Sequence, residues 1–292
     1  MIIPSAVLGQ EVSKVHGLTF ESGVRQVVCL LAPDSFTTGM DWLLERTVGL
    51  GATSVSFGQA SFTDLDFTDD VSLLAELLEL LIPALELMAD KAASLGLEVN
   101  WQVTNIQALG RTGVPLTVTV KDHEVAVAEE FVYLGSLSHS SVQSTHDYDI
   151  NRRSAIACAA MQSLDNQIWR SRVSTSTKLK LYNTCILPIF LYGSDCWAVL
   201  KTDARKIDAF DQWCLRMLLG IKWHQFVQND EVRRLMGQPK LTAIVQSCRL
   251  TLFGRIVHMD DNTDAKRILS TLPPENWSWR MSQGAGLRGL HL

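Results

Sequence analysis

Two adjacent carboxylates occupy a turn that the sequence predicts between two strand-like segments. The acids are Asp69 and Asp70, and Phe67 precedes them. Residues 61–67 alternate apolar and polar side chains and residues 71–75 are mostly apolar, so the pattern favours a β-hairpin. Carboxylates that project from a rigid sheet edge can hold Mg²⁺ against the phosphates of a nucleotide, which is the chemistry of two-metal phosphoryl transfer.

An ordinary turn explains the same two acids. Asp is a favoured turn residue because its side chain hydrogen-bonds to the nearby backbone, and a pair of them occurs by chance in many chains. Asp64 and Asp66 lie on the first strand of the expected hairpin, where they alternate with apolar residues and are expected to face solvent or local partners.

A polar loop containing glycine precedes this hairpin. It consists of Ser22 and Gly23, followed closely by Arg25 and Gln26. Glycine has no Cβ, so the backbone can approach a nucleotide closely, and the Arg and Gln side chains offer planar donors. On residue types alone, a simple polar turn accounts for this loop equally well.

Further motifs follow at ordered spacing. Downstream of the loop come Leu-Ala-Pro-Asp at residues 31–34, a helical pattern at residues 38–46 and the acidic turn itself. The later motifs lie at residues 95–102, 131–136, 191–197, 214–223 and 249–254. Several motifs in a fixed order are stronger evidence than any one of them alone.

Taken together, over roughly residues 20–280, these motifs resemble the reverse transcriptases of non-LTR (LINE-type) retrotransposons. The resemblance implies an RNA-directed DNA polymerase, which is a nucleotidyltransferase. It implies a palm domain, a helical thumb and Mg²⁺ or Mn²⁺ as the cofactor. An RNA template, a DNA primer and deoxynucleoside triphosphates would be the partners, and the resemblance does not identify a protein partner.

The resemblance also assigns roles to individual residues. Asp69 and Asp70 would be catalytic metal ligands, with Asp69 the more direct one. Nucleotide and template contacts would fall to Ser22, Gly23, Arg25, Gln26 and Phe67, with Arg25 in a more structural role. The primer grip would be formed by Tyr133, Leu134 and Gly135.

Several departures from the family pattern predict an incomplete metal site. The family takes a further acid from a strand that precedes the glycine loop, yet only about twenty residues stand there, and residues 1–10 contain no acid. Two acids from one turn would hold Mg²⁺ weakly because they repel each other and few ligands converge. The isolated chain is therefore expected to be inactive. The alternative interpretation is a non-catalytic retrotransposon remnant that binds RNA or an RNA–DNA duplex.

The expected fold class is an α/β (α+β) polymerase palm fragment followed by a mostly α-helical thumb and extension. Helices are expected at residues 35–48 and 77–94, and hairpins at residues 54–75 and 114–127. The expected divisions are a poorly matched segment at 1–19, a partial palm at 20–137, a loop at 138–149, a thumb-like region at 150–223, and a helical extension with a frayed tail at 224–292.

Composition restricts the function classes. The chain has 292 residues, of which 47% are hydrophobic, and a net charge of −5, which disfavours a strongly basic nucleic-acid binder. One basic segment could still track phosphates, although a solvated helix face explains it equally well. Its cations are Arg152, Arg153, Arg170, Arg172, Lys178 and Lys180.

Aromatic residues with helical spacing in the second half of the chain are expected in the core, although exposed rings could stack on bases. They are Trp169, Tyr182, Tyr192, Trp197, Trp213 and Trp223.

Cysteine spacing and hydropathy favour an intracellular protein, nuclear or cytoplasmic. The cysteines form no C-x-x-C pair, which disfavours structural zinc. The first residues lack the basic start and apolar core of a signal peptide. Residues 73–87 are apolar but interrupted by Glu76, Glu79, Pro83 and Glu86, so no membrane span is expected there.

Overall fold

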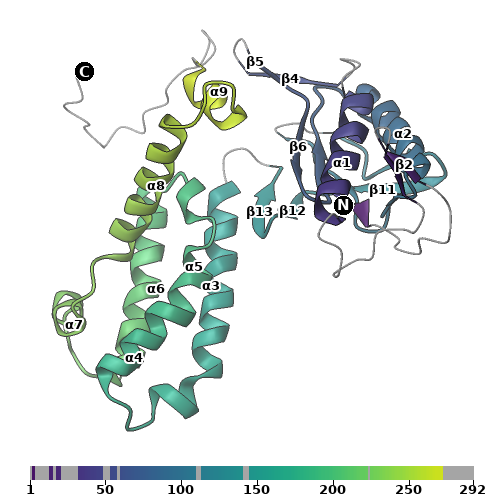
Figure 1. Cartoon of the computed structure of the whole chain (residues 1–292). Coiled ribbons are helices and arrows are strands. Elements are labelled where there is room, and N and C mark those ends of the chain that lie inside the picture. Colours follow the sequence, from purple (N-terminus) through teal and green to yellow (C-terminus); the bar gives the residue numbers. More distant parts are fainter. Residues whose placement is uncertain are drawn as a thin grey trace. The chain divides into compact units, whose positions relative to one another are not determined.

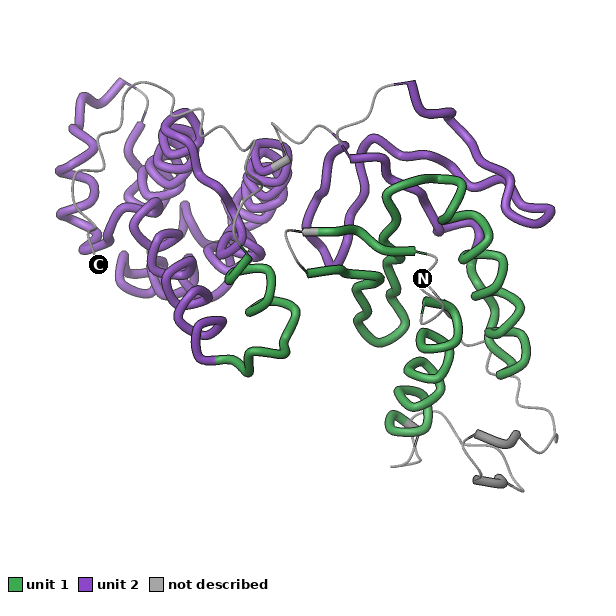
Figure 2. Tube along the Cα trace, turned by 90° about the horizontal axis from the view of Figure 1, so that it is seen from above, with its two compact units in different colours: residues 1–100, 259–292 green, residues 101–258 purple. Residues whose placement is uncertain are grey.

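The computed structural model describes residues 2–3, 13–15, 18–20, 32–48, 53–57, 60–109, 113–140, 145–222 and 224–271. Helices and strands both contribute to the fold. The chain forms two compact units, residues 1–100 with 259–292, and residues 101–258 (Figure 2). The palm and thumb divisions expected from the sequence stay a prediction.

Two helices of 17 residues each build the core of the first unit. Helix α1 (Ala32–Val48) packs against α2 (Leu78–Ser94), and both agree with the helices expected from apolar spacing. Pro83 is the sixth residue of α2 and does not end the helix, although the missing N–H of a proline at that position removes one intrahelical hydrogen bond. The buried side chains between the helices are those of Met40, Leu43, Met88 and Ala92.

The strands of the first unit form short pairs. Strand β4 (Val55–Phe57) pairs with β5 (Ala60–Phe62), and β6 (Asp64–Phe67) pairs with β7 (Asp70–Leu73). The single hairpin expected over residues 54–75 is therefore wrong, since Thr63 separates two ladders. Val71 and Leu73 of β7 pack on the helical core, which anchors the second hairpin.

The remaining elements of this unit are small. Strand β1 (Ile2–Ile3) pairs with β8 (Glu98–Val99), and β2 (Ser13–Val15) pairs with β3 (Leu18–Phe20). Helix α9 spans Asp264–Ser270 and contacts β5.

Strands open the second unit. Strands β10 (Thr117–Val120), β11 (His123–Val127) and β9 (Asn105–Ile106) form a sheet in the order β10-β11-β9. The β10–β11 hairpin was expected from alternation, and it buries Val118, Val120 and Val125 on one face. A separate hairpin pairs β12 (Glu130–Tyr133) with β13 (Ser136–His139).

A helical bundle completes the second unit, and α3, α5, α6 and α8 lie side by side in it (Figure 1). The helical pattern expected beyond residue 148 is present, and it begins slightly earlier. Its elements are α3 (Thr145–Ser163), η1 (Asp165–Trp169), α4 (Thr175–Leu181), η2 (Tyr182–Ile186), α5 (Leu187–Leu191), η3 (Ser194–Cys196), α6 (Lys201–Leu219), α7 (Asn229–Met236) and α8 (Leu241–Val257). No described helix is long and apolar enough to cross a membrane.

Aromatic side chains fill the centre of the bundle. Phe190 is fully buried, stacks on Phe210 with ring centroids 4.6 Å apart, and meets Trp197 edge-on at 5.6 Å. Trp169 is buried as well, and its indole nitrogen donates to the carbonyl of Met161 at 2.7 Å. The polar atom of this ring is therefore satisfied inside the core.

A polar network also lies within the bundle. The Tyr182 hydroxyl donates to Asp211 at 2.9 Å, and Arg233 donates to the other carboxylate oxygen at 2.8 Å. Burial raises the pKa of Asp211 above its ordinary value, although both donors oppose that shift. Burial likewise raises the pKa of Tyr182, so its hydroxyl keeps its proton and acts as a donor.

Truncation of the central aromatic should unfold the bundle more easily. Phe190→Ala removes a fully buried ring and leaves a cavity, so we expect the free energy of unfolding to fall by about 3–5 kcal/mol. The measurement is denaturant unfolding followed by tryptophan fluorescence. The matched control is Phe226→Ala, since Phe226 is fully exposed and its loss should leave stability nearly unchanged. Equal losses in the two variants would contradict this core assignment.

Candidate functional site

The acidic turn joins β6 to β7. Phe67 pairs with Asp70 across the hairpin, so Thr68 and Asp69 form the connection. Thr68 has φ of 56°, an unfavourable value for a β-branched residue. Its hydroxyl donates to the Asp69 carboxylate at 3.1 Å. Asp69 and Asp70 are half-buried, and Phe67 is 57% exposed at the same end of the hairpin.

The carboxylates of Asp69 and Asp70 do not make a complete metal site by themselves. Mg²⁺ prefers an octahedral shell of oxygen atoms, commonly one or two carboxylates with water and substrate phosphates. In the part of the chain that the structure describes, no group of three or more His, Cys, Asp or Glu side chains is placed to hold a metal ion. The pair could contribute to a shell that other ligands would have to finish.

The neighbouring acids line a different surface. Asp64 and Asp66 border a polar cleft of about 380 Å³ that Asp264 and Arg267 of α9 also line. Arg267 pairs with Asp264 at 2.9 Å and lies over the ring of Phe62, 5.1 Å from its centroid. The guanidinium is thus shared between an ion pair and an aromatic face.

The glycine loop expected to contact the nucleotide and template cannot be compared. Ser22, Gly23, Arg25 and Gln26 lie outside the described residues. Their assigned roles stay predictions from the family resemblance.

The turn expected to act as a primer grip is well defined. Leu134 and Gly135 connect β12 to β13 with φ of 47° and 80°, as a two-residue hairpin turn with positive φ at both positions requires. A Cβ on Gly135 would lie 3.1 Å from the Tyr192 ring. Glycine therefore serves both the backbone conformation and the close approach of that ring.

Three side chains from the helical bundle hold this turn. Arg152 donates to the Gly135 carbonyl at 3.0 Å, and Arg153 donates to the same oxygen. The Tyr192 hydroxyl donates to the Leu134 carbonyl at 2.6 Å. Both carbonyls of the turn are thereby fixed to α3 and to the end of α5.

The buried carboxylate of Asp149 binds the backbone of the same hairpin. Asp149 is 3% exposed; one oxygen accepts from the Leu137 amide at 3.0 Å and the other from the Trp197 indole at 2.9 Å. The Arg153 guanidinium lies 4.0 Å away and balances its charge. Gly193 has φ of 72°, and a Cβ there would stand 2.6 Å from the hydroxyl of Ser136, so this second glycine turn also requires its residue type.

Three of the six cations in the basic segment bind backbone carbonyls and a fourth pairs with an acid at the surface, which is a correction to the phosphate-tracking interpretation. Arg152 and Arg153 bind the hairpin turn, as described above. Lys178 is buried and donates to the Trp169 carbonyl at 2.6 Å, and Arg170 pairs with Asp165 at 2.7 Å. Charge counting in a sequence does not distinguish a cation that binds a backbone carbonyl from one that faces water.

Two cations of the segment remain available. Arg172 and Lys180 are exposed, and neither has a partner among the described residues. Arg172 precedes α4, and Lys180 lies in its last turn. These two side chains therefore have every donor available for phosphates, while Arg152 is half-exposed and uses Nη1 for its bond to the Gly135 carbonyl.

The aromatic set divides as well. Trp169, Tyr182 and Trp197 are buried, which confirms their expected place in the core. Tyr192 and Trp213 are 52% and 36% exposed, so the core assignment is wrong for them. Tyr192 departs from the helical pattern because α5 ends at Leu191 and the ring turns toward the hairpin. Trp223 lies outside the described residues.

The sequence alone did not predict that the turn at Gly135 and Ser136 lies against the turn at Gly193 and Ser194. Tyr133-Leu134-Gly135-Ser136 and Leu191-Tyr192-Gly193-Ser194 repeat a similar composition. That repeated pairing of an aromatic residue with Gly-Ser was the available signal, since a glycine that needs positive φ often marks a close approach.

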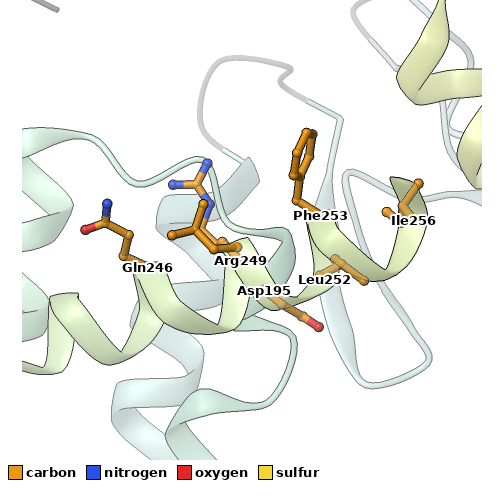
Figure 3. A pocket seen from close by; sticks show the side chains of 7 residues that line it. Asp195, Gln246, Arg249, Leu252, Phe253 and Ile256 are labelled. Atoms are coloured by element: carbon orange, nitrogen blue, oxygen red, sulfur yellow. The ribbon is translucent and has the colours of Figure 1, made fainter. Parts of the chain in front are cut away.

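A second cleft lies along α8 in the helical bundle. It measures about 360 Å³, and Figure 3 shows Gln246, Arg249 and Phe253 projecting from the helix while Asp195 comes from the adjoining η3 segment. Leu250, Leu252 and Ile256 complete the lining. Nearby, burial lowers the pKa of His146, with Asp149 and Asp203 opposing and Arg249 adding to the shift. The lining of the cleft thus combines an acid, a base and an amide with four apolar side chains.

The chain is similar to an uncharacterized transposon-derived protein of Caenorhabditis elegans. The two are 24% identical over 237 residues, which is 77% of this chain and 81% of the relative. No protein-family model matches the chain. The similarity supports a transposon-related origin.

Relief of the strained turn residue should slow local opening of the acidic hairpin. Asn tolerates positive φ far better than a β-branched residue, so Thr68→Asn is expected to stabilise the turn by about 1 kcal/mol. Hydrogen exchange of a peptide covering residues 60–75 would then slow by about fivefold. Thr117→Asn is the control, because Thr117 lies in extended strand β10, and a similar gain there would contradict the turn-specific cause.

Loss of the buried carboxylate should destabilise the helical unit strongly. Asp149→Ala leaves the Arg153 charge buried and orphans the Leu137 and Trp197 donors, so we expect a loss of about 3–5 kcal/mol. Denaturant unfolding followed by tryptophan fluorescence measures it. Asp147→Ala is the matched control, because Asp147 pairs with Lys206 at the surface and should matter little. Equal stability of the two variants would refute a central role for Asp149.

Proposed function

We propose that the chain derives from the reverse transcriptase of a non-LTR (LINE-type) retrotransposon and that its own activity is the binding of RNA or of an RNA–DNA duplex. In the parent enzyme, Asp69 and Asp70 would belong to the catalytic centre, and the turn at Leu134 and Gly135 would grip the primer. Polymerisation of DNA is proposed for the parent enzyme and not for this chain alone.

The observation that carries the proposal is the agreement of ordered motifs with the elements that would present them. The adjacent acids connect β6 to β7, and the grip residues connect β12 to β13. Helices follow the β12–β13 hairpin along the chain, which is the order expected if these helices derive from a thumb domain. The transposon-derived relative supports the same origin at a coarser level.

Binding without polymerisation agrees with the acidic turn. The described residues bring no third ligand to Asp69 and Asp70, and two neighbouring carboxylates repel each other when both are ionised. Such a pair fits only part of a magnesium shell, so no catalytic step is assigned to it here.

Charge sets the strength of the proposed binding. The net charge of −5 opposes association with a polyanion, and most of the basic segment is engaged internally. Arg172 and Lys180 are free to meet phosphates, and such contacts weaken steeply as salt displaces them. We therefore propose modest, salt-dependent binding that reads the shape of the duplex and not its sequence.

Binding of the full chain to a fluorescein-labelled RNA–DNA duplex tests the proposal. Anisotropy titrations over a range of salt concentrations should give a linear fall of log K with log salt. The double variant Arg172→Gln/Lys180→Gln should reduce the magnitude of that slope by about 1 to 2. Binding releases fewer counterions from the duplex when fewer phosphates are contacted. Lys206→Gln is the control, since Lys206 is already paired with Asp147. Absence of binding by the unaltered chain would overturn the proposal.

A primer-extension assay separates binding from catalysis on the same samples. With an RNA template, a DNA primer, deoxynucleoside triphosphates and Mg²⁺, we expect no template-dependent synthesis by this chain. Synthesis that is lost in Asp69→Ala and kept in Asp66→Ala would show instead that the chain is a working polymerase.

A further inference from the structure

Tyr192 is an exposed aromatic ring held in one orientation. Its side chain is 52% exposed, yet its hydroxyl donates to the Leu134 carbonyl at 2.6 Å. The Arg153 guanidinium lies over the ring, 4.3 Å from its centroid. An exposed tyrosine normally samples several rotamers, so these contacts remove much of the entropy that a ligand would otherwise have to freeze.

The Arg153 guanidinium and the hairpin turn cover part of the ring. Arg153 and the ring both approach the same point beside Gly135, where a Cβ would stand 3.4 Å from the guanidinium and 3.1 Å from the ring. The guanidinium and the turn therefore share one side. The side chain is nevertheless 52% exposed, so the part of the ring that these groups leave uncovered is available to a ligand.

Positive charge accompanies this surface. Arg153 is buried behind the ring, and Arg152 is half-exposed beside the turn. Arg152 donates through one nitrogen, Nη1, to the Gly135 carbonyl. A guanidinium has five N–H donors in a fork that matches phosphate oxygens, so the remaining nitrogens of Arg152 can bind an anion.

We propose that Tyr192 is a stacking platform for an unpaired base of RNA or DNA, with Arg152 as the contact for its phosphate. A planar ring next to a guanidinium recognises a ligand that is both flat and anionic, and a nucleotide is that ligand. The platform rests on the proposed binding of nucleic acid and deepens it. It assigns single-stranded nucleotides to a place that the duplex contacts of Arg172 and Lys180 do not use.

Binding of short single strands by the full chain tests the platform. Fluorescein-labelled 12-residue oligouridine RNA and oligothymidine DNA are titrated at fixed salt against the unaltered chain and Tyr192→Leu. The loss of base stacking should weaken binding by about tenfold. Trp213→Leu serves as the control, because Trp213 is partly exposed on α6 and has no assigned contact with the turn. The affinity of Trp213→Leu for both oligonucleotides should equal that of the unaltered chain.

Two further comparisons distinguish stacking from support of the turn. Tyr192→Phe keeps the ring and loses the bond to Leu134, so it should bind within about threefold of the unaltered chain. An abasic 12-residue strand should bind the unaltered chain and Tyr192→Leu equally, since it has no base to stack. If Tyr192→Phe is as weak as Tyr192→Leu, or if the abasic strand loses affinity to the same extent, Tyr192 only positions the turn and the platform is refuted.

The controls keep this proposal separate from the broader one. Unchanged affinity of Tyr192→Leu for oligonucleotides that the unaltered chain binds would refute the platform and leave nucleic-acid binding intact. Failure of the unaltered chain to bind any single strand or the RNA–DNA duplex would refute both. Thermal unfolding by circular dichroism shows that each variant is folded before its affinity is compared.

Discussion

A single buried carboxylate organises the helical unit. Asp149 lies near the start of α3, and its oxygens accept from a hairpin amide and from the indole of a core tryptophan, while Arg153 supplies the compensating charge. A buried charge with all of its partners specifies one arrangement, because every alternative leaves a charge or a donor unsatisfied at a cost of several kcal/mol. The hairpin β12–β13, α3 and the segment after α5 are therefore held in one arrangement relative to each other.

The hairpin β12–β13 and the hairpin β6–β7 belong to different units, and different kinds of contact hold them. The turn at Leu134 and Gly135 is bound at both of its carbonyls by side chains from the helices, so its backbone is held in one conformation. The acidic turn depends on its own ladder, on the contacts of Val71 and Leu73 with the core of its unit, and on a strained Thr68. The backbone of the turn at Leu134 and Gly135 is thus fixed by contacts from distant helices, whereas that of the turn at Asp69 depends mostly on its own hairpin.

Local patterns predicted the elements whose apolar residues recur at the period of a helix or a strand. Helices α1 and α2 and the β10–β11 hairpin follow from apolar spacing and alternation, since one face of each must be buried. Residues 54–75 were harder, because the alternation does not show where one ladder ends, and two hairpins formed in place of one. The basic segment was misread for a related reason: the sequence shows that Arg153 and Lys178 are cations but not that backbone carbonyls would bind them.

The sequence by itself determined the order of the motifs, the acids at a turn and the helical character of the second half, because these depend on residue type and on neighbours along the chain. Only the tertiary structure decided that Tyr192 leaves the core and that two glycine turns meet through Ser136. It also decided which cations stay free. These features join residues about sixty positions apart, as the bond from Tyr192 to Leu134 does. Contacts of that range are set by packing and by the satisfaction of buried polar groups, and no local pattern encodes them.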